Sequence, residues 1–264
     1  MGPFSPERLD EVALARAPLV QVLAQIRFAN DPDVAEPTRA RQLKHRLRDD
    51  YPVLRQEPSV EFRLDIGGGS PQRIDSTLWR LHDADAKWHI TFTEGFLALT
   101  TYEYVSRGDF CERLRHVLTE FLETNDIALL DRLGVRYTDR IDDPEVLGSL
   151  DRYVRSEFLA GASVPLDQGV VLDRSLWEMQ FRRTDEVVVS TRSIFLPPDV
   201  THDPGIKPSS GRSWVLDIDV YSESMTRFEP SSIAATAEEY AQQAYKVFRW
   251  SVTDDFLKHY GGEI

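Results

Sequence analysis

Two acidic side chains on one predicted strand are the best candidates for chemistry in this sequence. Asp217 and Asp219 alternate with apolar residues in the segment LDIDV (216–220), which predicts a strand whose two carboxylates share a face. They would lie about 7 Å apart along the strand. Paired carboxylates can hold a divalent cation or act as general acid and base. The alternative, which we favour, is that both pair with arginines on neighbouring strands.

Arginines on two other predicted strands could supply that opposite charge. The stretch RLGVRYTDRID (132–142) alternates like a strand and places Arg132, Arg136 and Arg140 on one face. Neighbouring arginines are then about 13 Å apart, too far for one small anion to touch all three. In the strand expected over 19–28, QIRF (25–28) resembles GVRY (134–137), so Arg27 corresponds to Arg136. A planar guanidinium binds phosphate or carboxylate through two parallel hydrogen bonds.

Together these side chains define a candidate ligand-binding face. Its members are Gln25, Arg27, Arg132, Arg136, Arg140, Asp217 and Asp219. Asp139 interrupts the alternation of its stretch, and we interpret it as the point where the strand bends or leaves the sheet. The ligand expected on this face is a small anion, a nucleotide or an acidic segment of a partner protein.

A basic helix is the second candidate site. In RARQLKHRLR (39–48), helical spacing places Arg41, Lys44, His45 and Arg48 in one stripe, away from the apolar residues. This is a local inversion of charge in an acidic chain. The stripe could bind an acidic partner, a phosphate backbone or a negative patch of the protein's own surface, and the alternative is a solvated face.

Catalytic and cofactor motifs do not occur in the chain. It has no glycine-rich phosphate loop and no nucleophile elbow, and its histidines lack the spacing of zinc ligands. Cys111 falls on the apolar stripe of a predicted helix, as a buried side chain would. We therefore expect no catalytic residues, no metal and no cofactor, and a non-enzyme is favoured.

Composition and charge restrict the expected partners and the expected cellular location. The chain has 264 residues and a formal net charge of −13, which argues against a nucleic-acid partner without excluding one. One cysteine, no apolar leader and no stretch long enough to span a bilayer predict a cytoplasmic protein without membrane contact.

The elements expected around these residues occur twice. The order β-α-β₄-α over 15–126 is followed by a similar order, with three strands after the helix, over 127–264. In the second half, a helix is expected across Val146–Phe158. STLWR (76–80) resembles RSLWE (174–178), so Trp79 corresponds to Trp177, and we expect both rings in the core rather than stacked on a ligand. We predict an α+β fold: a single domain whose duplicated halves form a largely antiparallel sheet with helices on one face, analogous to the TATA-binding-protein saddle.

Several stretches carry a family resemblance. They are APLVQVLAQIRF near the start, RLGVRYTDRID, LDIDVY (216–221) and AYKVFRWSVTDDF near the end. With these, the chain resembles a family of uncharacterised bacterial proteins of similar length that are described as sporadically distributed. The resemblance implies no activity for any residue. A patchy distribution suits mobile, defence-type gene cassettes.

Three functions remain open from the sequence. The first is a non-catalytic binding or regulatory protein that uses the arginine-bearing face. The second is a protein-interaction component of a defence-type cassette, such as a subunit, antitoxin or regulator. The third is a metal-assisted hydrolase or nucleotide-processing enzyme that uses Asp217 and Asp219.

Overall fold

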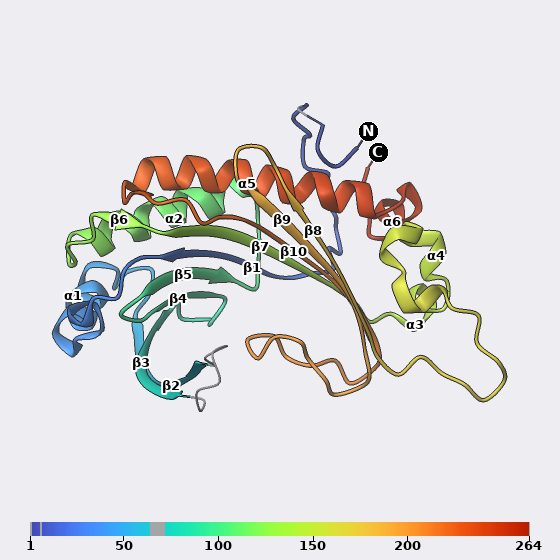
Figure 1. The fold of residues 1–264 in the computed structure, drawn as a ribbon, viewed down its shortest axis with the longest axis horizontal. Helices are drawn as coiled ribbons and strands as arrows, with labels where there is room; N and C mark the ends of the chain where they lie inside the picture. Colours follow the sequence, from blue (N-terminus) through green and yellow to red (C-terminus); the bar gives the residue numbers. More distant parts are fainter. Residues whose placement is uncertain (1, 6, 64–71, 264) are drawn as a thin grey trace. The chain divides into compact units, whose positions relative to one another are not determined.

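The order of helices and strands repeats along the chain, as the sequence predicts. The computed structural model describes residues 2–5, 7–63 and 72–263, with the backbone alone at 59–63, 72–76 and 160 (Figure 1). The first half contains β1 (Leu19–Arg27), η1 (Pro32–Ala35), α1 (Pro37–Arg46), β2 (Val53–Arg63), β3 (Gln72–His82), β4 (Trp88–Phe92), β5 (Phe96–Thr101) and α2 (Arg107–Leu122). The second half contains β6 (Leu129–Leu130), β7 (Arg132–Ile141), α3 (Pro144–Leu147), α4 (Leu150–Tyr153), η2 (Ser156–Phe158), η3 (Ala160–Ser163), β8 (Ser175–Arg182), β9 (Val188–Leu196), β10 (Ser213–Ser222), β11 (Thr226–Arg227), α5 (Pro230–Ser251) and α6 (Asp254–His259).

One nine-stranded, largely antiparallel sheet has its helices on one side, which confirms the predicted α+β class. The strand order is β2-β3-β4-β5-β1-β7-β10-β9-β8. Counted outward from β1, the first half places β5, β4, β3 and β2. Counted outward from β7, the second half places β10, β9 and β8, so it has one strand fewer. A separate two-stranded sheet pairs β11 with β6.

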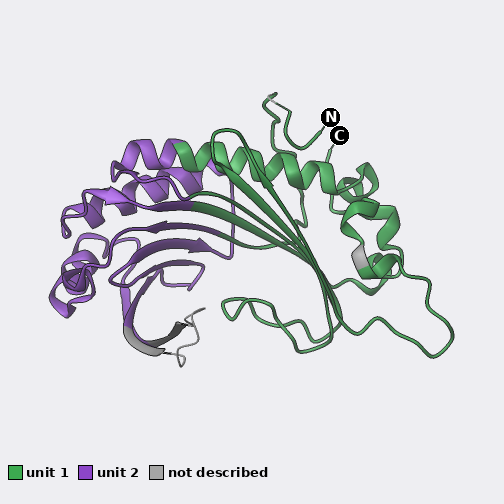
Figure 2. Cartoon of the chain, in the orientation of Figure 1, with its two compact units in different colours: residues 1–22, 134–222, 236–264 green, residues 23–133, 223–235 purple. Residues whose placement is uncertain are grey.

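The chain also divides into two compact units whose boundaries differ from those of the repeats. One unit consists of residues 1–22, 134–222 and 236–264, and the other of 23–133 and 223–235 (Figure 2). Each unit draws on both halves of the sequence, and β1 and β7 each contribute residues to both units. The single domain with repeats over 15–126 and 127–264 stays a prediction.

Apolar periodicity explains the principal elements. On β1, Val22, Ala24 and Ile26 have no exposed surface, as expected of alternate residues on one buried face. The α2 helix begins after Ser106, whose side chain accepts a hydrogen bond from the backbone N–H of Asp109. Its apolar stripe is buried and includes Cys111, which is 7% exposed. Among the described residues, no helix combines the length and the apolar character needed to cross a bilayer.

The helix expected across Val146–Phe158 is broken into short pieces. Pro144 begins α3, which stops at Gly148, and Ser149 has a non-helical backbone before α4 begins. The 3-10 turns η2 and η3 follow. Val146 and Phe158 are nevertheless 0% and 1% exposed. The burial expected from the sequence is correct, but apolar spacing across Gly148 and Ser149 does not require one continuous helix.

The strand does not leave the sheet at Asp139, so that part of the prediction for this residue is wrong. Asp139 lies inside β7, which continues to Ile141, and it shares by period two the face of the buried residue Val135. The side chain is 6% exposed, and burial raises the pKa of its carboxyl to about 7. An acid thus occupies a position on the face that Val135 buries.

The N-terminal segment packs against the C-terminal helices. The backbone N–H of Val12 donates to the Tyr245 hydroxyl at 2.7 Å, and the Gln242 side chain donates to the carbonyl of Leu9 at 3.1 Å. The backbone N–H of Arg16 donates to the carbonyl of Tyr260 at 3.1 Å. These bonds fix residues 9–16 along α5 and α6.

Candidate functional site

An ion pair between β7 and β10 forms the centre of the predicted ligand-binding face. Nε of Arg136 donates to Oδ1 of Asp217 at 2.6 Å, and Nη2 donates to Oδ2 at 2.7 Å. The Asp217 side chain is 2% exposed and that of Arg136 is 22% exposed. This two-bond geometry satisfies both groups at once, so the expectation that Asp217 pairs with an arginine is confirmed.

The loop between β9 and β10 adds further partners on this face. Nη1 of Arg136 lies 3.3 Å from Oδ2 of Asp203, and Nη1 of Arg140 donates to the backbone carbonyl of Lys207. Figure 1 draws this loop, residues 197–212, on the side of the strands away from α5. Asp203 also receives a 2.8 Å hydrogen bond from the N–H of Gly205 at Oδ1. The loop is thus held to β7 through two of the predicted arginines.

Electrostatics favour the charged pair despite its burial. Burial alone would lower the pKa of Arg136, but the hydrogen bonds and charge of Asp217, with help from Asp203 and Asp219, outweigh it and raise that pKa. His202 has the opposite balance: burial lowers its pKa, and the negative charge of Asp217 offsets only part of that effect. Nε2 of His202 is buried without a hydrogen-bond partner among the described residues, 4.0 Å from Oδ2 of Asp217.

Asp217 receives a further cation from the neighbouring strand. Arg192 lies directly opposite Asp217 in the β9–β10 register, with its Nη1 3.7 Å from Oδ2 of Asp217. Nε of Arg192 also donates to Oε1 of Glu178 on β8 at 3.1 Å. Charges of opposite sign therefore alternate across three strands, which is the ordinary way to satisfy a polar sheet face.

The other members of the predicted face lie elsewhere. Nε of Arg27 donates to Oε1 of Gln25 at 3.2 Å, and Nη1 of Arg132 approaches the same oxygen at 3.4 Å. These three residues gather in the unit formed by 23–133 and 223–235, whereas Arg136, Arg140 and both aspartates belong to the other unit. Each unit thus holds its own group of contacts among these residues.

The cation site that Asp217 and Asp219 could form, the less favoured alternative from the sequence, has no assembled ligand set in the described part of the chain. No group of three or more His, Cys, Asp or Glu side chains that could hold a metal ion occurs there. Asp217 directs both carboxylate oxygens at Arg136. A carboxylate bound in this way is a poor starting point for acid, base or ligand roles.

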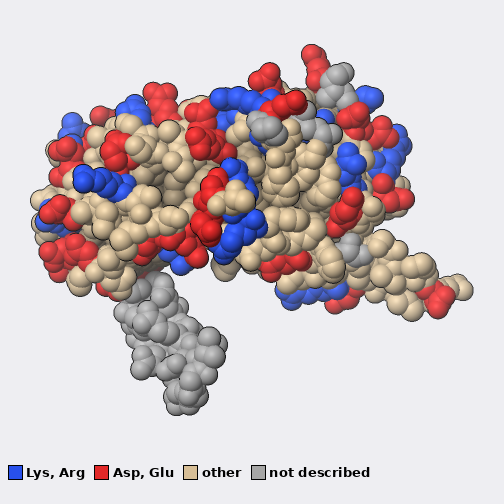
Figure 3. Space-filling model, turned by 45° about the horizontal axis from the view of Figure 1, so that its top comes forward, with Lys and Arg blue, Asp and Glu red and all other residues tan. Residues whose placement is uncertain are grey.

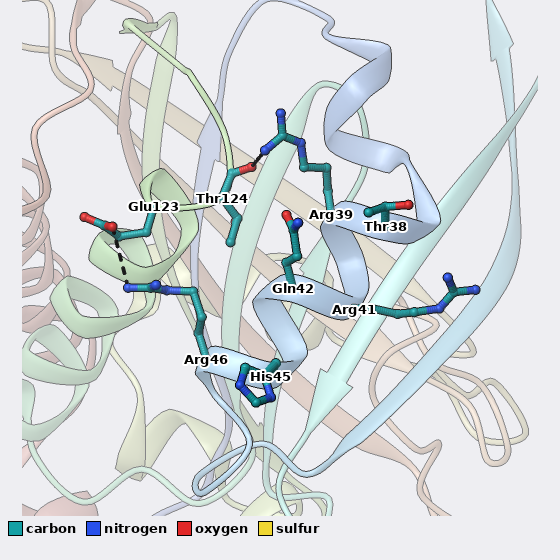
Figure 4. A pocket seen from close by; sticks show the side chains of 8 residues that line it. All are labelled: Thr38, Arg39, Arg41, Gln42, His45, Arg46, Glu123 and Thr124. Carbon is teal, nitrogen blue, oxygen red and sulfur yellow. Dashed lines mark hydrogen bonds and ion pairs between the residues drawn. The ribbon is translucent and has the colours of Figure 1, made fainter.

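A pocket of about 600 Å³ lies beside α1, where the sequence predicts the basic stripe (Figure 4). Its lining residues are Thr38, Arg39, Arg41, Gln42, His45, Arg46, Glu123 and Thr124. Nη1 of Arg39 donates to the carbonyl of Thr124 at 2.6 Å, and Nη2 of Arg46 lies 3.7 Å from Oε2 of Glu123. Nε of Arg46 binds Oε2 of Glu120 at 2.6 Å. Two arginines thus connect α1 to α2 and its C-terminal end.

Arg41 and His45 are the remaining cationic groups of this pocket, with His45 cationic only when protonated. Both are exposed, and neither forms a hydrogen bond or ion pair with any residue that the structure describes. Figure 4 shows them extending from α1 without the contacts that Arg39 and Arg46 make. Because the helix buries Ala40 and Leu43, these polar groups face outward.

The predicted stripe is only partly brought together. Of its four residues, Arg41 and His45 line the pocket, and Lys44 and Arg48 do not. Three further residues of the helix line the pocket without having been predicted from the sequence: Arg39, Gln42 and Arg46. Their spacing of three, four and seven residues was a usable signal for a second polar face of the same helix.

The charge around α1 differs from that of the wider surface. Figure 3 shows Lys and Arg mixed with Asp and Glu over the face that it displays. Residues 37–48 contain five Lys and Arg and no Asp or Glu, in a chain whose net charge is −13. The helix is a concentrated source of positive charge.

Comparisons with known proteins give no indication of function, so the proposal below rests on the contacts and the pocket described above. No family model matches the chain, and no curated protein matches it. The resemblance to the sporadically distributed bacterial family stays a prediction.

Proposed function

We propose that the protein is a non-catalytic binding protein that holds an acidic segment of a partner protein in the α1 pocket. The observation that carries the proposal is an exposed pocket of about 600 Å³ in which Arg41 and His45 have no partner in the described part of the chain. Exposed cations in an acidic protein attract negatively charged partners selectively, because the rest of the surface repels them.

The spacing of these groups suits an extended acidic segment. Arg41 and His45 are one helical turn apart, which separates their Cβ atoms by about 6 Å. Alternate side chains of an extended peptide are about 7 Å apart and point the same way. Two acidic residues separated by one position could therefore meet both groups. Glu123 at the opposite wall would favour binding along the α1 side of the pocket.

The arginine-bearing sheet face has weaker support as a ligand site. The carboxylates of Asp217 and Asp203 already neutralise Arg136, and a small anion would have to displace them. The same pairing weakens the case for a hydrolase that uses Asp217. Protein interaction within a defence-type cassette is compatible with the α1 pocket, and neighbouring genes would supply candidate partners.

Binding of a fluorescein-labelled peptide of alternating glutamate and serine, followed by fluorescence anisotropy, tests the proposal. We expect binding that Arg41→Glu weakens at least tenfold and His45→Ala weakens severalfold. Arg48→Glu is the matched control, because it makes the same change of charge on the same segment outside the pocket. Equal losses from Arg41→Glu and Arg48→Glu would indicate general electrostatic attraction and contradict the proposal, as would the absence of binding.

A further inference from the structure

The outer edge of β8 has no partner strand among the described residues. β8 ends the sheet order, whereas its counterpart β3 is flanked by β2. The N–H of Arg183 donates to the carbonyl of Val187 where the β8–β9 hairpin closes. Hydrogen bonding alternates along an antiparallel pair, so the even-numbered residues of β8 direct their N–H and C=O groups outward. The edge can therefore accept another strand.

Large apolar side chains are exposed along this edge. Leu176 is 61% exposed, Trp177 is 50% exposed and Phe181 is 37% exposed. Trp79, at the corresponding position of β3, is 6% exposed, and its Nε1 donates to the carbonyl of Ala35 at 2.8 Å. The expectation that both tryptophans lie in the core is thus wrong for Trp177. Edge strands are normally shielded by charge, bulges or covering elements, and an uncovered apolar edge marks an interaction site.

The sequence of β8 is complementary to itself in an antiparallel arrangement. When Met179 lies opposite Met179 of a second copy, Trp177 lies opposite Phe181, and Glu178 lies opposite Gln180. The aromatic pairs and the methionines share one face, and they fall at the non-hydrogen-bonded positions, where opposing side chains are closest. Shifting the register by two residues toward the strand's start would place Glu178 opposite itself, and like charges in direct opposition are destabilising.

We propose that β8 is a dimerisation strand that pairs antiparallel with β8 of a second copy of this chain, centred on Met179. The second copy supplies the outer strand that the second half of the fold lacks. Two Trp177–Phe181 pairs flank the two-fold axis, and the outward N–H and C=O groups of the even-numbered residues form the ladder. The α1 pocket contains no residue of β8. The experiments on the dimer and those on the proposed binding function can therefore fail independently of one another.

A cysteine crosslink tests the register directly. Cα atoms at a non-hydrogen-bonded antiparallel pair lie about 4.5 Å apart, within the range that a disulfide spans. The natural Cys111 is buried, so an added thiol reacts alone. We expect Met179→Cys to form a disulfide-linked dimer under mild oxidation. Leu176→Cys is the control, because in this register its partner is six residues along the strand, about 20 Å away.

A backbone substitution tests the pairing without a crosslink. Gln180→Pro removes an outward N–H that is not bonded to β9, and proline is tolerated on edge strands. Analytical ultracentrifugation should show a dimer for the wild type and for Gln180→Ala, and at least a tenfold weaker dimer for Gln180→Pro. Circular dichroism would verify that the Gln180→Pro fold is retained.

Three outcomes would overturn the proposal. The first is a wild-type monomer at every concentration up to the solubility limit. The second is a dimer that survives Gln180→Pro and in which Met179→Cys does not crosslink. The third is a monomer in which the outward amides of the even-numbered residues 176–182 are protected from hydrogen exchange, because another segment of the same chain would then cover the edge.

Discussion

Arg136 binds Asp217 through two short parallel hydrogen bonds, Nε to Oδ1 at 2.6 Å and Nη2 to Oδ2 at 2.7 Å. The carboxylate is almost fully buried, and it is reached by a second arginine, Arg192, at 3.7 Å. Asp217, one of the two aspartates considered for chemistry in the sequence, therefore joins β10 to β7 through Arg136. Removing this ion pair should therefore lower the stability of the fold.

We expect Asp217→Ala to lower the free energy of unfolding by about 2–4 kcal/mol, because it leaves Arg136 partly buried without the carboxylate that accepts its two short hydrogen bonds. Urea denaturation gives the value. Asp219→Ala, two residues along the same strand, is the control and should cost less. The double variant Arg136→Met with Asp217→Leu should recover part of the loss, because two apolar side chains replace the buried charges. An Asp217→Ala protein as stable as the wild type would contradict the structural role.

Asp203→Ala should loosen the β9–β10 loop with little effect on overall stability. Its contact with Arg136 is longer, at 3.3 Å, and Asp217 continues to hold that arginine. A partly exposed ion pair contributes about 1 kcal/mol or less. Hydrogen exchange across residues 197–212 should quicken. Lys207→Ala is a suitable control. Arg140 contacts Lys207 through its backbone carbonyl, which the substitution leaves in place. Unchanged exchange in Asp203→Ala would show that the loop is held by other contacts.

Asp139 should make the protein less stable as the pH rises from about 4 to about 7. Burial raises the pKa of its carboxyl from 3.8 to about 7, so between these values the unfolded chain has lost a proton that the folded chain retains. The unfolded state then binds fewer protons, and the free energy of unfolding falls with rising pH, by at most about 1.4 kcal/mol per pH unit. Above the folded pKa the loss is complete, at about 4 kcal/mol.

Asp139→Asn removes this titration and should flatten that part of the stability profile. Unfolding midpoints in urea, measured at several pH values, provide the comparison. Asp142→Asn, at an exposed position of the same region, should leave the slope unchanged. A slope that persists in Asp139→Asn would assign the effect to another group.

The two matched tryptophans should respond differently to truncation. Trp79→Ala should cost about 3–5 kcal/mol, because it empties a buried site and leaves the carbonyl of Ala35 without its donor. Trp177→Ala should cost the monomer under about 1 kcal/mol, because half of its surface is already exposed. Thermal unfolding at low protein concentration separates the two effects. Similar costs would mean that Trp177 is packed in solution.

Sequence periodicity was sufficient for the elements and for their repetition. Alternating apolar residues predicted the strands β1, β7 and β10, and apolar residues at helical spacing predicted the helices α2 and α5. It failed across Val146–Phe158, because buried apolar residues can keep their spacing while the backbone leaves the helical conformation at Ser149. It also failed at Asp139, where an acid occupies an apolar position. Apolar periodicity predicts which positions are buried when they hold apolar residues, and it cannot identify a charged residue that is buried.

The site was predicted only in part, for a different reason. Correspondence of QIRF with GVRY correctly identified two strands at equivalent places, but Arg27 and Arg136 lie in different compact units. The partners of Arg136 include Asp203, which belongs to an irregular loop without periodicity. Trp177 resembles Trp79 in local sequence, yet Trp79 is buried and bonded to the carbonyl of Ala35 in η1, whereas Trp177 is 50% exposed. Such contacts join distant segments, and local patterns carry no information about them.

The packing of residues 9–16 against α5 and α6 sets an order of events during synthesis. Val12 and Tyr245 are separated by 233 positions, so the N-terminal segment leaves the ribosome long before its binding surface exists. Until α5 and α6 are translated, that segment has no native contacts with them. In a chain released before α5 and α6 are made, residues 9–16 would therefore be unpacked and open to a protease. Packing of residues 9–16 requires that the C-terminal helices have been translated.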